Sequence, residues 1–403
     1  MTEVLRAREN ETFRLDERDA DFLGRLLGGR FERRHDGCAV CRLVGQVQLP
    51  SRRILVVHSQ KAPDAGVLAW AAYADPRLTG LRMLTGALPL GSLADLTGVT
   101  VGLFLRELMA VVRKRGLRRD YQRVHVRSST IRGRIDFHRL ASTGGDLARM
   151  PCVSWERLPE TPLNRLLSAA LACVDRIPGL PPELRRLRSE AGAPFAHVSP
   201  SVDRDLLSGK KQLSRLEAPY ELVLALALLI LAGSGIQERQ RGEMSPAFFI
   251  NIEHLFEMAV ARALEESPLR ARAKVPAYYL VQHAGREPER RSMEMDVFLR
   301  EFPAGPVVVD AKYKTKISSS NIQQIATYCL MTRSARGLLV LPAGHVDVNQ
   351  VLVVGPQENA VEIHILELDT SATDLAGWRA NARDLAEATM GVLGASELAS
   401  RLP

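Results

Sequence analysis

The chain has 403 residues, of which 46% are apolar and 25% are charged, and its formal net charge at pH 7 is +8. This composition is that of an ordinary globular protein rather than a disordered one, and the length favours two or three domains. The basic balance permits binding to a polyanion without establishing it.

Three features of the sequence bear on its compartment. Residues 1–20 are rich in charge and contain no apolar run, so we expect no signal peptide. The most apolar stretch, residues 222–232, is shorter than the roughly 20 residues of a membrane span and is better explained as a buried core helix. The cysteines suggest no disulfide framework, which indicates a cytoplasmic protein without a membrane segment. The cysteines are Cys38, Cys41, Cys152, Cys173 and Cys329.

Cys38 and Cys41 form a C-x-x-C pair, with His35 close in sequence. A structural zinc site needs four ligands, and the sequence offers no second pair. Redox chemistry would need a thioredoxin-like setting, which the surrounding pattern does not show. We therefore interpret both as ordinary cysteines.

The first part of the chain mixes short strands with turns. Residues 42–49 and 53–58 are strand-like and flank a Pro-Ser pair, which predicts a hairpin. Residues 66–78 are compatible with either a helix or a strand. From residue 101 to 115 the apolar positions recur at helical spacing. We predict a β-rich N-terminal domain over residues 1–115.

A basic stretch follows. Residues 113–139 contain ten Arg or Lys and only two acids, interrupted by apolar residues with strand-like alternation. Such a stretch can follow DNA phosphates, and Arg132 and Arg134 are the best candidates for those contacts. A solvated basic face or a surface for a partner protein explains it equally well. We predict a basic and helical middle region over residues 116–240. Its predicted helices are residues 161–175 and 219–232.

From residue 241 onward, helices and strands alternate in the order helix, three strands, helix, strand. This order predicts an α/β domain over residues 241–403, with a mixed central sheet flanked by helices, within an α+β multidomain chain. The predicted helices are residues 248–266, 319–332 and a last one from about 371. The predicted strands are residues 275–281, 293–299, 307–312, 337–341, 351–354 and 361–368.

The most informative unit is Asp296, followed after thirteen residues by Asp310-Ala311-Lys312. The period of a strand places Asp310 and Lys312 on one face. Residues 302–306 (FPAGP) have turn chemistry, so the two strands are expected to form a hairpin that brings Asp296 next to Asp310.

This arrangement suits phosphodiester cleavage. Two carboxylates and a backbone carbonyl are hard oxygen ligands for Mg²⁺, with Mn²⁺ as an alternative. The metal would lower the pKa of a bound water and polarise the phosphate. Lys312 would orient that water or stabilise the developing charge. The competing interpretation, a surface Asp-x-Lys ion pair, is weakened because Asp310 ends a run of three valines.

Other residues have two interpretations each. Glu257, on the preceding helix, is either a third metal carboxylate or an exposed helix charge. Glu294 shares a face with Asp296, which leaves the ligand set open. Gln324 and Tyr328 lie on one face of the next helix and either line the site or are polar tips of a packed helix.

These residues resemble the PD-(D/E)xK nuclease superfamily and, more narrowly, the McrC subunit of McrBC-type modification-dependent restriction systems. The resemblance touches most of the chain. The matching stretches are LVGQVQLPSRRILVVHSQK (43–61), IRGRIDF (131–137), ETPLNRLLSAAL (160–171), NIEHLFEMAVARAL (251–264), EMDVFL (294–299), VVVDAKYKTK (307–316) and NIQQIATY (321–328).

The resemblance implies that Asp296 and Asp310 bind the metal, that Lys312 is the catalytic lysine, and that Gln324 and Tyr328 form the helix motif behind it. One departure is Met295, where the superfamily motif has proline. The resemblance also implies a partner, a McrB-like AAA+ GTPase, which recognises modified DNA and is stimulated by the N-terminal domain of the McrC-like subunit. The chain itself has no G-x-x-x-x-G-K-[ST] motif.

The leading hypothesis is a magnesium-dependent DNA endonuclease subunit of a restriction complex. A second hypothesis is an adaptor that mainly activates the GTPase ring and carries a weak or degenerate nuclease site. A third is a nuclease attached to another helicase or repair machine.

Overall fold

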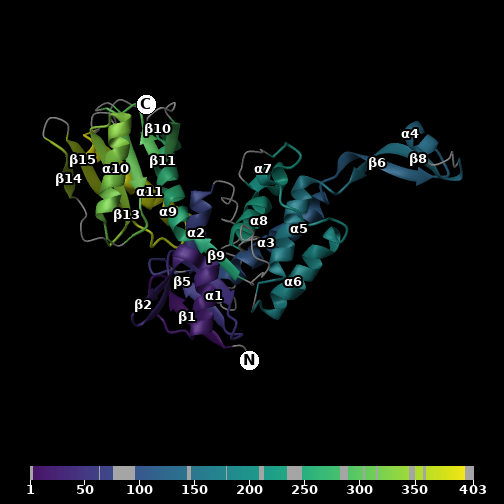
Figure 1. Cartoon of the computed structure of the whole chain (residues 1–403), viewed down its shortest axis with the longest axis horizontal. Helices are drawn as coiled ribbons and strands as arrows, with labels where there is room; N and C mark the ends of the chain where they lie inside the picture. The colour runs from purple at the N-terminus through teal and green to yellow at the C-terminus, as the bar shows by residue number, and fades with distance from the viewer. Residues whose placement is uncertain are drawn as a thin grey trace. The chain divides into compact units, whose positions relative to one another are not determined.

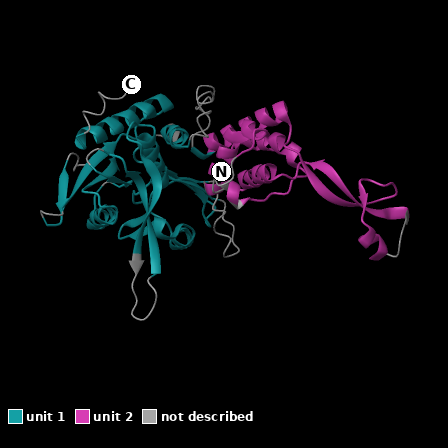
Figure 2. Ribbon diagram, turned by 90° about the horizontal axis from the view of Figure 1, so that it is seen from above, with its two compact units in different colours: residues 1–97, 247–403 teal, residues 98–246 magenta. Residues whose placement is uncertain are grey.

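The computed structural model describes residues 3–62, 64–75, 96–142, 147–177, 179–207, 213–233, 247–281, 289–302, 305–314, 316–344, 350–356 and 360–394. The chain forms two compact units, residues 1–97 with 247–403 and residues 98–246 (Figure 2). Several sheets and helices in both units give the mixed α and β multidomain architecture that the sequence predicts. The predicted domain boundaries stay predictions, although residues 1–97 share a unit with the C-terminal segment.

The N-terminal part of the first unit contains a four-stranded sheet in the order β1-β5-β4-β9. β4 and β5 are antiparallel, which confirms the predicted hairpin. The bounds are β1 (Val4–Arg8), β4 (Leu43–Gln48), β5 (Ile54–His58) and β9 (Ala247–Asn251). Beside this sheet lie α1 (Glu17–Leu27), the hairpin of β2 (Phe31–Arg34) and β3 (Gly37–Val40), and α2 (Asp64–Ala74). The helix α2 settles the ambiguous segment as far as Ala74, and residues 76–78 lie outside the described residues.

Strand β9 corrects one prediction. The helix expected over residues 248–266 is instead a strand followed by helix α9 (Ile252–Glu265). Phe248 and its apolar neighbours are good strand residues, and pairing with β4 outweighs their helical spacing. Gly45 allows this pairing, because its φ is +150° and a Cβ there would collide with the carbonyl oxygen of Phe248. Asn251 then caps α9 by accepting a hydrogen bond from the His254 N–H.

The C-terminal part of the same unit is built on a six-stranded sheet in the order β10-β11-β12-β13-β15-β14 (Figure 1). β12 and β13, and β13 and β15, are parallel, and the other neighbours are antiparallel, so the sheet is mixed as predicted. The strands are β10 (Arg272–Val281), β11 (Glu289–Leu299), β12 (Val307–Ala311), β13 (Arg336–Pro342), β14 (Val351–Val354) and β15 (Val361–Leu368). Helix α10 (Ser319–Thr332) packs its buried Ile325 and Cys329 against Val308 and Leu339 of this sheet.

An aromatic cluster joins three helices to the segment that directly follows β12. Trp378 of α11 (Leu375–Val392) stacks on Trp70 of α2, with ring centroids 5.2 Å apart, and on Tyr73 at 6.1 Å. Tyr313 and Phe256 of α9 complete the cluster. Both tryptophans are fully buried, so this cluster is the central packing feature of the unit.

The second unit contains helices and a three-stranded antiparallel sheet in the order β6-β8-β7, seen at one end of this unit in Figure 2. The strands are β6 (Asp120–Ser128), β7 (Arg134–Ile135) and β8 (Met150–Leu158). The helices are α3 (Leu96–Arg115), which begins just before the unit, α4 (Phe137–Ser142), α5 (Pro162–Val174), α6 (Pro182–Gly192), α7 (Arg204–Leu207) and α8 (Glu221–Gly233). Thr161 caps α5, and Pro162 occupies its first turn, as predicted.

Two further observations concern the cysteines and the apolar helices. All five cysteines are buried and none is in a disulfide. Among the helices that the structure describes, none has both the length and the apolar content to cross a bilayer. The apolar run at residues 222–232 forms the packed helix α8, in agreement with the sequence interpretation.

The aromatic cluster gives a test of stability. Replacing Trp378 by alanine leaves a cavity beside Trp70 and Tyr73 and should destabilise the first unit by about 3 to 5 kcal/mol. The matched control is Trp155→Ala, because Trp155 is 67% exposed and should change stability by less than about 0.5 kcal/mol. Urea unfolding followed by circular dichroism measures both, and equal destabilisation would contradict the central role of the cluster.

Candidate active site

The site is built at the end of β12. All five residues of this strand are buried, and Asp310 is only 2% exposed. The backbone N–H of Lys312 donates to the carbonyl of Val340 at 2.9 Å, so the chain stays beside β13 for one more residue. The side chains of Asp310 and Lys312 meet: Nζ lies 3.0 Å from Oδ1 and 2.9 Å from Oδ2.

The neighbouring strand supplies the second carboxylate. β11 and β12 form the predicted antiparallel hairpin, with Val297 opposite Val309. The N–H of Ala311 donates to Oδ2 of Asp296 at 3.0 Å. The structure therefore brings Asp296, Asp310 and Lys312 together, although thirteen residues separate the two aspartates in sequence.

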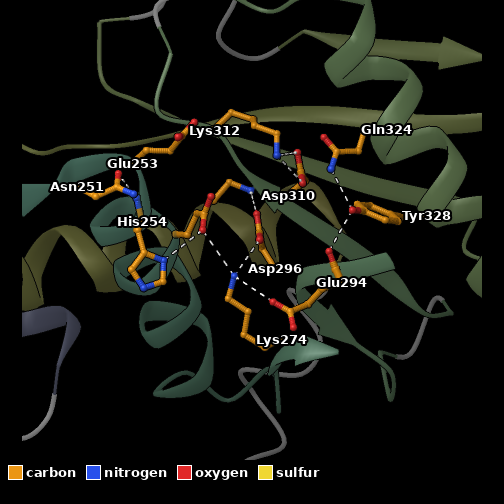
Figure 3. Close-up of polar contacts among 12 residues, drawn as sticks. Asn251, Glu253, His254, Lys274, Glu294, Asp296, Asp310, Lys312, Gln324 and Tyr328 are labelled. Atoms are coloured by element: carbon orange, nitrogen blue, oxygen red, sulfur yellow. Dashed lines mark hydrogen bonds and ion pairs between the residues drawn. The ribbon is translucent and has the colours of Figure 1, made fainter. Parts of the chain in front are cut away.

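A second lysine lies among the acids. Lys274 Nζ is 3.4 Å from Oδ1 of Asp296 and 3.6 Å from the carboxylates of both Glu257 and Glu294 (Figure 3). Glu257 is also 3.6 Å from the imidazole of His254, on the same turn of α9. Glu257 is thus part of the site rather than a free helix charge, and the same lysine links it to Glu294 and Asp296.

The pKa values follow from burial and these charges. Burial raises the pKa of Asp310 to about 6, against the opposing charge of Lys312 and with a further increase from Asp296. Burial also raises the pKa of Asp296. Burial acts to lower the pKa of Lys312, but Asp310 outweighs it, so the net pKa is raised and the ammonium is retained.

The pKa of Glu257 is lowered, unlike those of Asp296 and Asp310, whereas the pKa of Lys274 is raised, like that of Lys312. Burial acts to raise the pKa of Glu257, but the hydrogen bond with His254 and the charge of Lys274 hold it below its usual value. Burial acts to lower the pKa of Lys274, and the acids around it outweigh that effect. Glu257 is therefore a carboxylate and Lys274 an ammonium at neutral pH.

Gln324 and Tyr328 are linked to the site through hydrogen bonds. Gln324 Nε2 donates to the Tyr328 hydroxyl at 2.9 Å, and that hydroxyl donates to the carbonyl of Glu294 at 3.0 Å. Tyr328 is 3% exposed, so it holds β11 in place next to Asp296. Figure 3 shows the half-buried Gln324 on the side of the site where Asp310 and Lys312 lie.

The donor set fits a magnesium ion. Oδ2 of Asp310 is buried and accepts no hydrogen bond from any described residue, although the Lys312 ammonium is close to it. Among the described residues, no three Asp, Glu, His or Cys side chains already converge as a ligand set. Magnesium is usually bound by one or two carboxylates and keeps several waters. The oxygen ligands and negative charges of Asp310 and Asp296 meet that need, and Glu257 is a further carboxylate nearby.

The predicted DNA contacts Arg132 and Arg134 lie in the second unit and are both exposed. Arg134 pairs with Val153, and Val153 pairs with His125. Arg134, Val153 and His125 therefore share one face of the three-stranded sheet. The alternation of β6 and β8 adds further exposed residues to that face, hereafter the basic–aromatic face. They are Tyr121, Arg123, Arg127, Trp155 and Arg157.

Lys274 and His254 are site residues that the sequence motifs do not mark. Lys274 is a basic residue near the start of strand β10, and His254 lies in the first turn of a helix. Neither has a fixed spacing from Asp310, because strand pairing and the packing of α9 bring them there. The only signal in the sequence was the amphipathic helix that also carries Glu257.

Comparison with solved structures gives one chain of similar fold and one weaker match. A chain of the Thermococcus gammatolerans assembly of McrB AAA+ hexamers with bound McrC is 17% identical, with 96% of this chain and 100% of that chain covered and a TM-score of 0.57. A chain of the cryo-EM structure of the McrBC complex of the same organism is 18% identical, with 65% and 87% covered and a TM-score of 0.43.

The family is established by sequence. A comparison with curated proteins found no match. The family model described as McrBC 5-methylcytosine restriction system component matches residues 43–342, well over half of the chain. This range includes the hairpin of β4 and β5, the basic–aromatic face and the carboxylate–lysine site. The chain therefore belongs to the family of McrBC 5-methylcytosine restriction system components.

Proposed function

We propose that this chain is the DNA endonuclease subunit of a 5-methylcytosine restriction complex and that it cleaves phosphodiester bonds at a magnesium-dependent centre. The observation that carries the proposal is the ion pair of Lys312 with the 2% exposed Asp310, with Asp296 held beside it through the Ala311 N–H. A buried carboxylate pair next to a lysine is costly for stability alone, which favours a catalytic role.

Each residue has a defined task in this proposal. Asp310 and Asp296 would hold the ion, with the Oδ2 of Asp310 available for it, and Glu257 would contribute charge or a bridging water. When bound, magnesium, or manganese in its place, supplies a water of lowered pKa and polarises the phosphate. Lys312 carries a retained positive charge that orients the attacking water and offsets the charge that develops on the phosphate.

The topology supports a PD-(D/E)xK core for the six-stranded sheet. Helix α9, strands β10, β11 and β12, helix α10 and strand β13 follow one another in the order that the sequence pattern predicts. The candidate carboxylates lie on the neighbouring antiparallel strands β11 and β12, and helix α10 packs on the same sheet. Gln324 and Tyr328 then act by fixing β11 and by facing the site from α10.

We further propose that the subunit works with a McrB-like AAA+ GTPase. The solved structure that is similar along the whole chain is a complex of McrB AAA+ hexamers with bound McrC. The sequence offers no nucleotide-binding loop of its own. The motor would therefore supply GTP hydrolysis and recognition of modified DNA, while this chain would supply the nuclease centre.

The basic–aromatic face supports a second candidate role, docking. Two exposed aromatic side chains, Tyr121 and Trp155, are each 67% exposed, and arginines alternate with them. Exposed aromatic and arginine side chains are typical of binding surfaces rather than of solvated faces. The face is proposed to bind a macromolecule. DNA contact through Arg132 and Arg134 stays a prediction beside docking to the motor.

The nuclease proposal is tested by Lys312→Ala. Removal of the ammonium next to Asp310 should lower the cleavage rate of methylated plasmid by about a hundredfold or more in the presence of the motor, GTP and magnesium. Stimulation of GTP hydrolysis should be unchanged, because the variant leaves the N-terminal domain, to which the resemblance assigns that stimulation, unaltered. Cleavage and GTP turnover are measured in the same reaction.

The matched control is Lys316→Ala, since Lys316 is exposed and has no place in the site. It should cleave at the rate of the unmodified chain. Cleavage that persists in the Lys312→Ala variant would remove the nuclease centre from this position. Stimulation of GTP hydrolysis without cleavage by the unmodified chain would instead favour the adaptor role.

The pKa of Asp310 gives a pH prediction. Metal binding needs the carboxylate, and burial raises the pKa of Asp310 to about 6. Below this pH the group is protonated, so magnesium affinity should fall about tenfold between pH 7 and pH 5. Calorimetric titration of the full chain with magnesium measures this. A constant affinity over that range would mean that Asp310 is not a ligand.

A further inference from the structure

The position of Lys274 is unusual for a surface lysine. Its ammonium lies 3.4 to 3.6 Å from the carboxylates of Asp296, Glu257 and Glu294. One ammonium that contacts three carboxylates, two on β11 and one on α9, is not the ordinary pair of an exposed lysine with one acid. The contacts converge on the side of the site opposite Lys312, so Lys274 is the second fixed cation of the centre.

The backbone conformation at Lys274 indicates that its contacts hold it in place. Its φ is +52°, in the left-handed region that side chains other than glycine avoid, although the residue lies within β10. It lies between the register pairs Ala273–Val297 and Val275–Met295, so it is opposite Asp296. A non-glycine residue in this conformation is strained and persists where surrounding contacts hold it.

The charge balance of the centre shows what the lysine does. In the part of the chain that the structure describes, the carboxylates of Glu257, Glu294, Asp296 and Asp310 lie near two ammonium groups, those of Lys274 and Lys312. Two negative charges are left, which matches one divalent ion. Without Lys274 the excess rises by one, Asp296 loses its nearest cation, and the attraction for a divalent ion increases.

We propose that Lys274 is a positioning residue that acts as a built-in counter-cation, holding Asp296, Glu257 and Glu294 together without metal and limiting the affinity of the centre for a divalent ion. This inference rests on the proposed nuclease function. The ammonium and the metal ion compete, because the same carboxylates attract both. Displacing the ammonium costs free energy, and this lowers the affinity for the metal ion. The centre would then bind the ion more tightly once DNA phosphates add negative charge.

The test compares metal affinity in the full chain. Lys274→Met is titrated with Mn²⁺ and with Mg²⁺ by calorimetry at pH 7.5, without DNA, beside the unmodified chain and the control Lys316→Met. The control removes one positive charge from an exposed position. Lys274→Gln is a second variant that keeps a polar side chain. Thermal melting without and with saturating metal shows whether each variant is folded.

We expect Lys274→Met to bind the metal about tenfold more tightly than the unmodified chain, with Lys316→Met unchanged. Its metal-free form should melt at a lower temperature, and saturating metal should restore the loss, because metal replaces the missing cation. Affinity that is unchanged or weaker in both Lys274 variants, while Asp310→Asn abolishes binding, would overturn the counter-cation role and leave the metal site standing. No metal binding by the unmodified chain would overturn the proposed centre itself and this inference with it.

Discussion

The first unit depends on keeping carboxylates charged and adjacent where little water reaches them. Asp310 is 2% exposed, and burial alone would neutralise it. The Lys312 ammonium and the Ala311 N–H, which binds Asp296, supply the compensation. Because each of these groups is held by the backbone of β11, β12 or the residues directly after β12, the central hairpin must keep its register for the centre to exist.

The packing around the hairpin explains how this register is kept. The segment after Lys312 is anchored by Tyr313, whose hydroxyl donates to the fully buried Glu9 at 2.8 Å, and Glu9 also accepts from Ser59. The ring of Tyr313 contacts Trp70 and Phe256. Residues that directly follow β1 and β5 therefore hold the segment after β12, which gives a physical reason for residues 1–97 to share a unit with the C-terminal segment.

Helix α9 has a comparable connection to the N-terminal residues. Glu253 is paired with Arg42 at 2.8 Å and Arg30 at 3.4 Å, and Arg30 also donates to the capping Asn251. These contacts fix the first turn of the helix, and one turn later the same helix presents Glu257 to Lys274.

The second unit carries a different kind of chemistry, exposed arginine and aromatic side chains on a small sheet, as a binding surface does. Cutting and docking are thus proposed for separate units of one chain.

The sequence by itself determined the elements whose signals are local. The spacing of Asp310 and Lys312, the turn chemistry before β12, the predicted helices over residues 161–175 and 319–332, and the apolar run of α8 each agree with what the structure contains. Only the tertiary structure decided that residues 247–251 leave the predicted helix to join the N-terminal sheet, that Tyr328 is buried behind β11, and that Lys274 lies among three acids. The reason is physical. Periodicity and turn residues act over a few neighbours, whereas strand pairing, helix packing and charge compensation join residues that the sequence keeps far apart.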